Sequence, residues 1–284
     1  MNPLVTVGIP TYSNPEGLRR TLDCITNQSY KDLDILIADN CSPDPRVQEV
    51  IKEFKDPRIR NFRHETNIGV DKNYRFVIDI AVGKYFMFAQ DDDWWSPDYI
   101  KNLVEGLERE PEAPVGACPS RYLGSNGVES EPHPLNNISV YKTVGCGDMG
   151  FICMGMWRRE AFKRCEVRLP VYVLGGDHMT VAHAIMAYGD PVIVPSEQYV
   201  KGYREGRFQI CFNNDFWYSF RSWFWLMKVL VLSNQIPAQR KILLPFVAIT
   251  NLARACAITG VQVVIGMPDN PVKRMVQKRF FGAN

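Results

Sequence analysis

The chain has 284 residues, of which 46% are hydrophobic and 23% are charged, and its formal net charge at pH 7 is +2. These values are ordinary for a globular protein with an ample core, and they exclude a disordered or low-complexity chain. The small net charge argues neither for nor against a nucleic-acid partner. We expect no such partner. The eight cysteines form no CxxC pair, which argues against a zinc or thioredoxin-type motif and indicates reduced thiols.

No uncharged apolar run reaches the ~18 to 20 residues of a membrane span. The nearest candidate, residues 216–232, is interrupted by Arg221 and Lys228. The first residues run directly into a predicted strand, and no signal peptide is recognisable. We therefore expect a cytoplasmic protein, and a peripheral contact with the cytoplasmic face of a membrane stays open.

The first 110 residues alternate short apolar runs with amphipathic stretches. The apolar runs predict strands over residues 4–9, 34–38, 58–62 and 85–89. The spacing of apolar residues predicts helices over residues 15–28, 45–54, from the turn at 67–69 to Gly83, and 97–109. Asn14 and Ser96 are predicted N-caps, each followed by proline at the first helical position. This alternation predicts a parallel sheet with right-handed crossovers.

Polar residues follow three of the predicted strands: Thr11 and Tyr12, then Asp39, then the triplet Asp91, Asp92 and Asp93. Parallel strand ends open on one edge of a sheet, so these residues predict a single site. Three adjacent carboxylates repel one another, and a divalent cation with a preference for oxygen ligands, Mg²⁺ or Mn²⁺, would relieve that repulsion. The alternative is a solvated acidic loop.

The second half of the chain is less regular. An apolar piece covers residues 115–118, and strands are predicted at 151–157, 192–195 and from 199 into a basic loop that ends at Arg207. A short helix is predicted over 158–164, and Gly175 and Gly176 open another helix, which carries Asp177 and His178. An acid at a helix N-terminus also has a purely structural explanation, because the helix dipole favours it there. The glycine pattern at 145–150 lacks a preceding strand, so it is not a dinucleotide fingerprint.

Residues 208–284 are predicted to form a C-terminal helical extension. Its helical patterns cover residues 216–227, 242–258 and 271–281, and they mix tryptophan and phenylalanine with lysine and arginine. Two interpretations stay open: packing against the main domain, or contact with a membrane or a lipid-linked acceptor.

Six local motifs, taken together and in order, resemble the family 2 glycosyltransferases with the GT-A fold. The motifs are Val7 to Tyr12, Ile37 to Ser42, Asn67 to Gly69 with Asn73, Gly83 to Tyr85, the cluster from Gln90 to Pro97, and Gly176 to His178. The resemblance covers residues 4 to about 205. It implies an α/β fold of the GT-A type, which is Rossmann-like with a mainly parallel central sheet. It also divides residues 1–207 into a half that would bind the sugar donor, residues 1 to about 110, and a half that would bind the acceptor, from about 111 to 207.

The resemblance implies roles for residues that would bind a nucleotide sugar. Pro10, Thr11 and Tyr12 would border the base and ribose, and Asp39 would accept a hydrogen bond from the base. Lys72 stands where the family often has arginine, near the nucleotide. Arg204 and Arg207 belong to a basic loop that would close over the diphosphate.

In the acidic motif of the family, the last acid coordinates the metal that bridges the diphosphate. When the motif is aligned on Trp95 and Pro97, its usual leading acid is replaced by Gln90. We therefore expect Asp92 to be the direct ligand of Mn²⁺ or Mg²⁺. Asp91 would contact ribose or a metal-bound water, and Asp93 would assist.

The family catalyses inverting transfer, in which a carboxylate deprotonates the acceptor hydroxyl. The base usually comes from an acidic pair at the start of a helix, and here that pair is Asp177 and His178. Asp177 is the expected base and His178 the alternative, because the unperturbed pKa of histidine, ~6.5, suits the role.

The function implied by the resemblance is transfer of a sugar from a nucleoside-diphosphate donor, with UDP favoured, in polysaccharide or glycoconjugate synthesis. The acceptor would be a hydroxyl of a glycan or of a lipid-linked acceptor. Two alternatives stay open: a sugar-nucleotide nucleotidyltransferase, which would be expected to have a glycine-rich basic loop after the first strand, and a non-catalytic module that binds nucleotide sugars.

Overall fold

The computed structural model describes residues 2–91, 93–122, 135, 154–165, 176–195, 199–201, 228 and 230–242. For residues 122, 176–179, 182 and 201 the backbone alone is described. Several predicted features therefore lie outside the described residues: Asp92, the glycine pattern at 145–150, Arg204 and Arg207, the boundary at 207–208, and most of the C-terminal extension.

The predicted alternation of strands and helices in the first half is confirmed. The strands are β1 (Val5–Thr11), β2 (Leu33–Asp39), β3 (Ile59–Arg63) and β4 (Tyr85–Phe88). The helices are α1 (Pro15–Thr26), α2 (Arg46–Glu53), α3 (Val70–Ile80) and α4 (Tyr99–Arg109).

The second half contributes shorter elements. Its strands are β5 (Trp94–Trp95), β6 (Val115–Ala117), β7 (Ser120–Tyr122), β8 (Met156–Arg158), β9 (Val192–Ile193) and β10 (Tyr199–Lys201). Its helices are α7 (Arg159–Arg164), α8 (Gly176–Tyr188) and the single turn α11 (Ala238–Lys241). In the described part of the chain, no helix has the length and apolar character of a membrane span.

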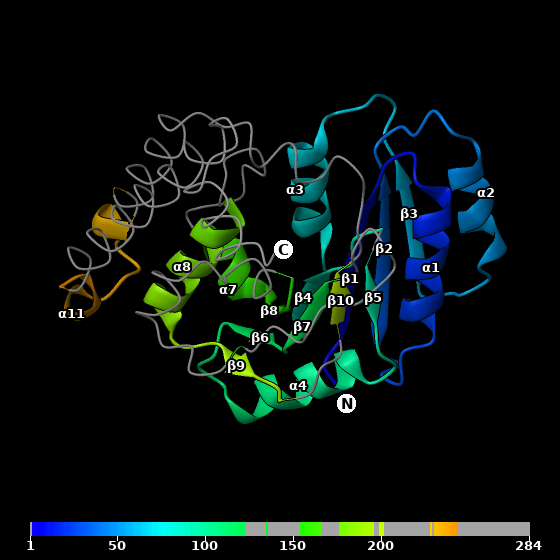
Figure 1. The fold of residues 1–284 in the computed structure, drawn as a ribbon. Helices are drawn as coiled ribbons and strands as arrows, with labels where there is room; N and C mark the ends of the chain where they lie inside the picture. The colour runs from blue at the N-terminus through cyan, green and yellow to red at the C-terminus, as the bar shows by residue number, and fades with distance from the viewer. Residues whose placement is uncertain are drawn as a thin grey trace, which may run out of the picture.

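The main sheet has seven strands in the order β3-β2-β1-β4-β8-β6-β9. Neighbours from β3 to β4 run parallel, whereas β8 runs antiparallel to both β4 and β6. Helices α1 and α2 cover one face of the parallel part and α3 covers the other (Figure 1). A second sheet of three strands has the order β5-β10-β7. The architecture is therefore an α/β fold with a mostly parallel central sheet, as predicted.

Burial explains why the apolar runs become strands. Every residue of β1, β2 and β4 is buried, as expected for parallel strands covered by helices on both faces. Helix α1 buries Leu18, Leu22 and Ile25 at helical spacing, and this stripe packs it onto the sheet. The weaker run at β3 is the edge strand, whose residues are half-buried or exposed.

Two predicted helix boundaries are wrong, and tertiary contacts explain both. Helix α3 ends at Ile80 rather than at Gly83, because the backbone N–H groups of Val82 and Gly83 donate to the Thr6 hydroxyl. Helix α4 begins at Tyr99 with Asp98 as its N-cap, so Ser96 and Pro97 precede the helix. Their carbonyl groups accept hydrogen bonds from the Gln28 side chain and the Ser29 backbone of the loop after α1.

Strand β5 was not predicted, because two tryptophans after an acidic run carry no period-2 pattern. It pairs antiparallel with β10, which places Trp95 opposite Tyr199 and Trp94 opposite Val200. The second sheet thereby joins the segment after the acid triplet to a strand more than a hundred positions later in the chain.

Candidate active site

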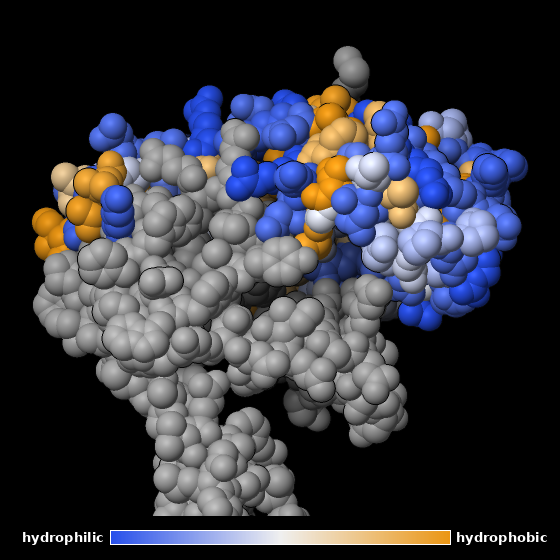
Figure 2. All heavy atoms as spheres, turned by 90° about the horizontal axis from the view of Figure 1, so that it is seen from above, coloured by the Kyte–Doolittle hydropathy of each residue, from blue (hydrophilic) through white to orange (hydrophobic). Residues whose placement is uncertain are grey.

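The carboxyl ends of the parallel strands form one polar edge. Thr11, Asp39 and Arg63 are register partners across β1, β2 and β3, so they stand in a row at this edge. Figure 2 views the molecule from this side, and the described surface around the edge is mainly hydrophilic with scattered apolar groups. The expectation that the polar strand ends meet is therefore confirmed for β1 and β2.

The turn that follows β4, here called the acid turn and running from Gln90 to Asp93, lies at the same edge. The Thr11 hydroxyl donates to Asp91 Oδ2 at 2.8 Å, which joins the acid turn to the end of β1. The Tyr199 hydroxyl donates to Asp93 Oδ2 at 2.5 Å. Asp91 and Asp93 are only 7% and 4% exposed, so both are held within the protein and neither is a freely solvated acid.

Helix α1 supports the acid turn through its first two turns. Asn14 caps the helix, as predicted, by accepting a hydrogen bond from the Gly17 N–H, and its side-chain amide donates to the Asp91 carbonyl at 2.7 Å. The Thr21 hydroxyl donates to the Gln90 carbonyl at 3.0 Å. A Cβ atom at Gly17 would lie 1.8 Å from the Asp91 carbonyl oxygen, so the helix can approach the turn only with glycine at this position.

The side chain of Gln90 lies against Met154. It is 8% exposed, and its amide lies 3.3 Å from the Met154 sulfur atom. The residue that stands where the family usually has the leading acid of the motif is therefore buried in this chain.

Asp39 is fully buried and accepts three hydrogen bonds. Ser42 N–H donates to Oδ1 at 2.8 Å, while the Gln48 amide and the Arg63 guanidinium donate to Oδ2 at 2.7 Å and 3.1 Å. Arg63 also donates to the Ser42 carbonyl at 3.0 Å, which fixes the loop after β2. The sequence analysis missed Gln48 and Arg63, because each reaches Asp39 from a different element and has no motif of its own.

Two loops at this edge have an unusual backbone. Ser13 and Cys41 are the two non-glycine residues with positive φ in the described part of the chain, at 52° and 59°. They follow β1 and β2, and the Ser13 N–H donates to the hydroxyl of Ser42 at 3.0 Å. Left-handed backbone in non-glycine residues is uncommon and gathers at functional sites, so both loops are candidates for ligand contact.

The other described residues that are expected to bind the nucleotide lie around this edge. Pro10 and Thr11 belong to β1 rather than to a loop, because β1 continues its pairing with β2 beyond the last residue paired with β4. Tyr12 is 42% exposed just after the strand. Lys72 lies in the first turn of α3 and is exposed.

The expected base lies on helix α8. Gly176 begins the helix, so the backbone of Asp177 and His178 forms its first turn, as predicted, while their side chains lie outside the described residues. His183, further along α8, is fully buried and its Nε2 lies 3.1 Å from the hydroxyl of Ser233, which identifies it as a packing residue. Among the residues that the structure describes, no three His, Cys, Asp or Glu side chains gather as a ready metal-ligand set.

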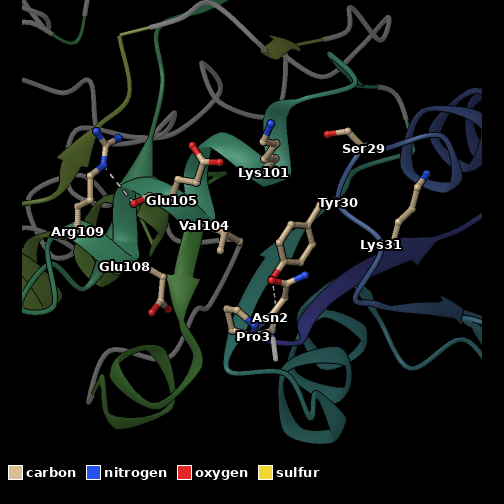
Figure 3. A pocket seen from close by; sticks show the side chains of 10 residues that line it. All are labelled: Asn2, Pro3, Ser29, Tyr30, Lys31, Lys101, Val104, Glu105, Glu108 and Arg109. Carbon is tan, nitrogen blue, oxygen red and sulfur yellow. Dashed lines mark hydrogen bonds between the residues drawn. The ribbon is translucent and has the colours of Figure 1, made fainter.

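A pocket lies at the opposite, amino edge of the sheet. This open pocket of about 720 Å³ is lined by residues that precede β1 and β2 and by α4, among them Pro3, Tyr30 and Lys101 (Figure 3). The Tyr30 hydroxyl donates to the Pro3 carbonyl at 2.6 Å, and glutamates and lysines share the wall. Open α/β sheets bind ligands at their carboxyl ends, so the acid-turn edge is the stronger candidate.

Comparisons with known proteins show which family the chain resembles. The family described as "Glycosyl transferase family 2" matches residues 6–165. The putative colanic acid biosynthesis glycosyl transferase WcaA of Escherichia coli is 29% identical over 218 residues, which cover 74% of this chain and 76% of that protein. The chain also matches two longer curated proteins, of which the matched parts cover only 15% and 16%.

Two solved structures share the fold at low sequence identity. TarS of S. aureus, in complex with UDP-GlcNAc, has a TM-score of 0.73 at 15% identity, with 88% of this chain and 72% of that chain covered. The mannosyltransferase PcManGT of Pyrobaculum calidifontis, in complex with GDP-Man and Mn²⁺, has a TM-score of 0.61 at 16% identity. The match covers 98% of this chain and 80% of that chain. Because the family match spans more than half of the sequence and includes β1 to β4, the acid turn and β8, the chain belongs to glycosyl transferase family 2.

Proposed function

We propose that this glycosyltransferase moves a sugar from a nucleoside-diphosphate donor, with UDP favoured, to a hydroxyl of a glycan or of a lipid-linked acceptor, with inversion at the anomeric carbon. The observation that carries the proposal is the acid turn, which Thr11, Asn14 and Tyr199 hold at the carboxyl edge of a parallel sheet. The similarity to WcaA favours polysaccharide synthesis as the setting, and the UDP-GlcNAc and GDP-Man complexes of the structural neighbours favour a nucleotide sugar.

The nucleotide would lie along the row of strand ends. Tyr12 would border the base. A carboxylate can accept about four hydrogen bonds, and Asp39 accepts three, so one acceptor position remains on its Oδ1. We assign that position to an N–H group of the base. Because Asp39 is fully buried, this contact requires a local movement of the residues that cover it.

A divalent cation, Mn²⁺ or Mg²⁺, would be held by Asp92, with Asp91 beside it and Asp93 in support. Carboxylate oxygens are the hard ligands these ions prefer, and the turn offers three in succession. When bound, the cation would neutralise charge on the diphosphate leaving group. Lys72, Arg204 and Arg207 would add positive charge near the phosphates.

Asp177 would act as the base in the transfer itself. Its carboxylate would take the proton of the acceptor hydroxyl, whose oxygen would form the new bond to the anomeric carbon as the bond from that carbon to the phosphate oxygen breaks. The nucleoside diphosphate would leave on the opposite face of the sugar. His178 is the alternative base at the same helix start.

A panel of UDP-, GDP- and dTDP-sugars tests the proposal, with release of nucleoside diphosphate as the readout. We expect slow hydrolysis of at least one donor with Mn²⁺, its loss on chelation, and its loss in Asp92→Ala. A nucleotidyltransferase would instead form a nucleotide sugar from a sugar phosphate and a nucleoside triphosphate with release of pyrophosphate. A binding module would bind donors without release, and either result would contradict the proposed function.

A further inference from the structure

Asp93, the last acid of the acid turn, is held by a residue far away in the sequence. Its Oδ2 accepts the 2.5 Å hydrogen bond from the hydroxyl of Tyr199, and the two residues are 4% and 3% exposed. A buried carboxylate is stable only when donors satisfy it, so this contact is an important constraint on where the turn can lie.

The ring of Tyr199 is itself fixed from two sides. It stacks on Trp95 at 5.9 Å between ring centroids and 23° between planes, and the ring of Tyr99 lies 6.3 Å away. Trp95 and Tyr199 are also cross-strand partners in β5 and β10. Burial first, and then the nearby Cys118 and Asp93, hold the pKa of the Tyr99 hydroxyl well above its ordinary value. The hydroxyl of Tyr199 therefore reaches Asp93 from a rigid and dry aromatic cluster.

We propose that Tyr199 is a positioning residue for the cation site, and that Asp93 is the anchor of the acid turn rather than a direct ligand. This inference rests on the proposed function, because it explains how Asp93 supports cation binding at Asp92. Thr11 and Asn14 fix the start of the turn through Asp91, and Tyr199 fixes its end through Asp93. Asp92 stands between these two residues in the sequence, so fixing both ends of the turn would limit where its carboxylate can bind the cation.

Tyr199 is also the first residue of β10, the strand that precedes the basic loop. Strand β10 begins at Tyr199 and ends at Lys201, just before the segment that carries Arg204 and Arg207. The hydrogen bond to Asp93 and the pairing with β5 hold the acid turn and the start of β10 against each other. Loss of the Tyr199 hydroxyl should therefore weaken binding of the cation and the diphosphate as a pair.

Four variants of the full chain test the anchor: Tyr199→Phe, Asp93→Asn, Asp92→Asn and the control Tyr30→Phe. Tyr30 donates one hydrogen bond to the Pro3 carbonyl at the opposite edge of the sheet, so its variant loses a comparable hydroxyl away from the site. Calorimetry measures UDP binding in the presence of Mn²⁺. Hydrogen exchange of a peptide that contains residues 90–95 measures the order of the turn without metal.

We expect Tyr199→Phe to weaken Mn²⁺–UDP binding by roughly 10- to 100-fold, the usual cost of losing a residue that orients a ligand, and to speed exchange of the turn. Asp93→Asn should cost less than Tyr199→Phe, because an asparagine oxygen can still accept the tyrosine hydrogen bond, and Asp92→Asn should cost the most. Tyr30→Phe should match the wild type in both readouts.

Two results would overturn the inference: exchange of the turn in Tyr199→Phe equal to that in Tyr30→Phe, or a loss in Asp93→Asn as large as in Asp92→Asn. If Tyr199→Phe does not fold, the comparison of Asp93→Asn with Asp92→Asn decides the role of Asp93. If the wild type binds no UDP with Mn²⁺, the proposed function fails, and the exchange measurement alone still decides whether Tyr199 holds the turn.

Discussion

Replacing Gly17 with alanine is expected to abolish metal-dependent binding of the nucleotide sugar and to lower stability. The new Cβ atom would lie 1.8 Å from the Asp91 carbonyl oxygen and 2.2 Å from the Asn14 amide nitrogen. Because the first of these is a backbone atom of the acid turn, helix α1 and the turn must separate. Overpacking of this kind typically costs about 1–3 kcal/mol of folding free energy. The separation would also break the hydrogen bonds from Asn14 and Thr21 to the turn.

A matched control is available in Gly106, another helical glycine. A Cβ atom at Gly106 would meet the Val194 side chain at 3.1 Å, and a methyl group can shift where a backbone carbonyl cannot. The gain in helix propensity, about 1 kcal/mol, offsets that contact, so Gly106→Ala should change stability little in either direction. Thermal unfolding and UDP titration with Mn²⁺ measure both variants. Retained UDP affinity in Gly17→Ala would mean that α1 does not position the acid turn.

Replacing Asp177 with asparagine is expected to lower turnover by about two orders of magnitude or more, while binding of the donor is retained. The backbone of Asp177 lies in the first turn of α8, on a different element from the acid turn and from the strand ends that would hold the donor. An amide of the same size cannot take the proton of the acceptor hydroxyl. Transfer kinetics with saturating donor give the turnover, and titration with UDP and Mn²⁺ gives the donor affinity.

The same assay on His178→Asn separates the two candidate bases. A histidine base would make turnover change with pH near pH ~6.5, where its imidazole titrates. If Asp177 is the base, neither the wild type nor His178→Asn should show this change, and the two pH profiles of turnover should agree. Near-normal turnover in Asp177→Asn, together with a large loss in His178→Asn, would move the role to His178. Near-normal turnover in both would place the base outside this helix start.

The first half of the fold, from β1 to α4, could be predicted from the sequence because its signals are local. Fully buried parallel strands appear as apolar runs, and amphipathic helices repeat their apolar residues every three or four positions. Polar residues at the ends of such strands share one edge by topology alone, and for this reason Thr11 and Asp39 could be expected to meet. The N-cap at Asn14 was likewise a local signal, and the structure confirms it.

The support of the site could not be predicted, because it depends on contacts between elements far apart in the chain. Gly17 looks like a weak residue in a helix, and its need for close approach appears only when α1 lies against Asp91. Tyr199 has no sequence signal that points to Asp93. The predicted cap at Ser96 was wrong for the same reason. The Gln28 side chain donates a hydrogen bond to the Ser96 carbonyl, and this contact holds the segment outside the helix.

The most direct test of the account is a structure of the protein with UDP and Mn²⁺ bound. We predict the cation in direct contact with the carboxylate of Asp92, with the diphosphate beside the acid turn and the base near Tyr12 and Asp39. We also predict that the bond between Tyr199 and Asp93 is kept. A nucleotide in the pocket at the amino edge, beside Pro3 and Tyr30, would contradict the account, as would a cation without contact to the acid turn.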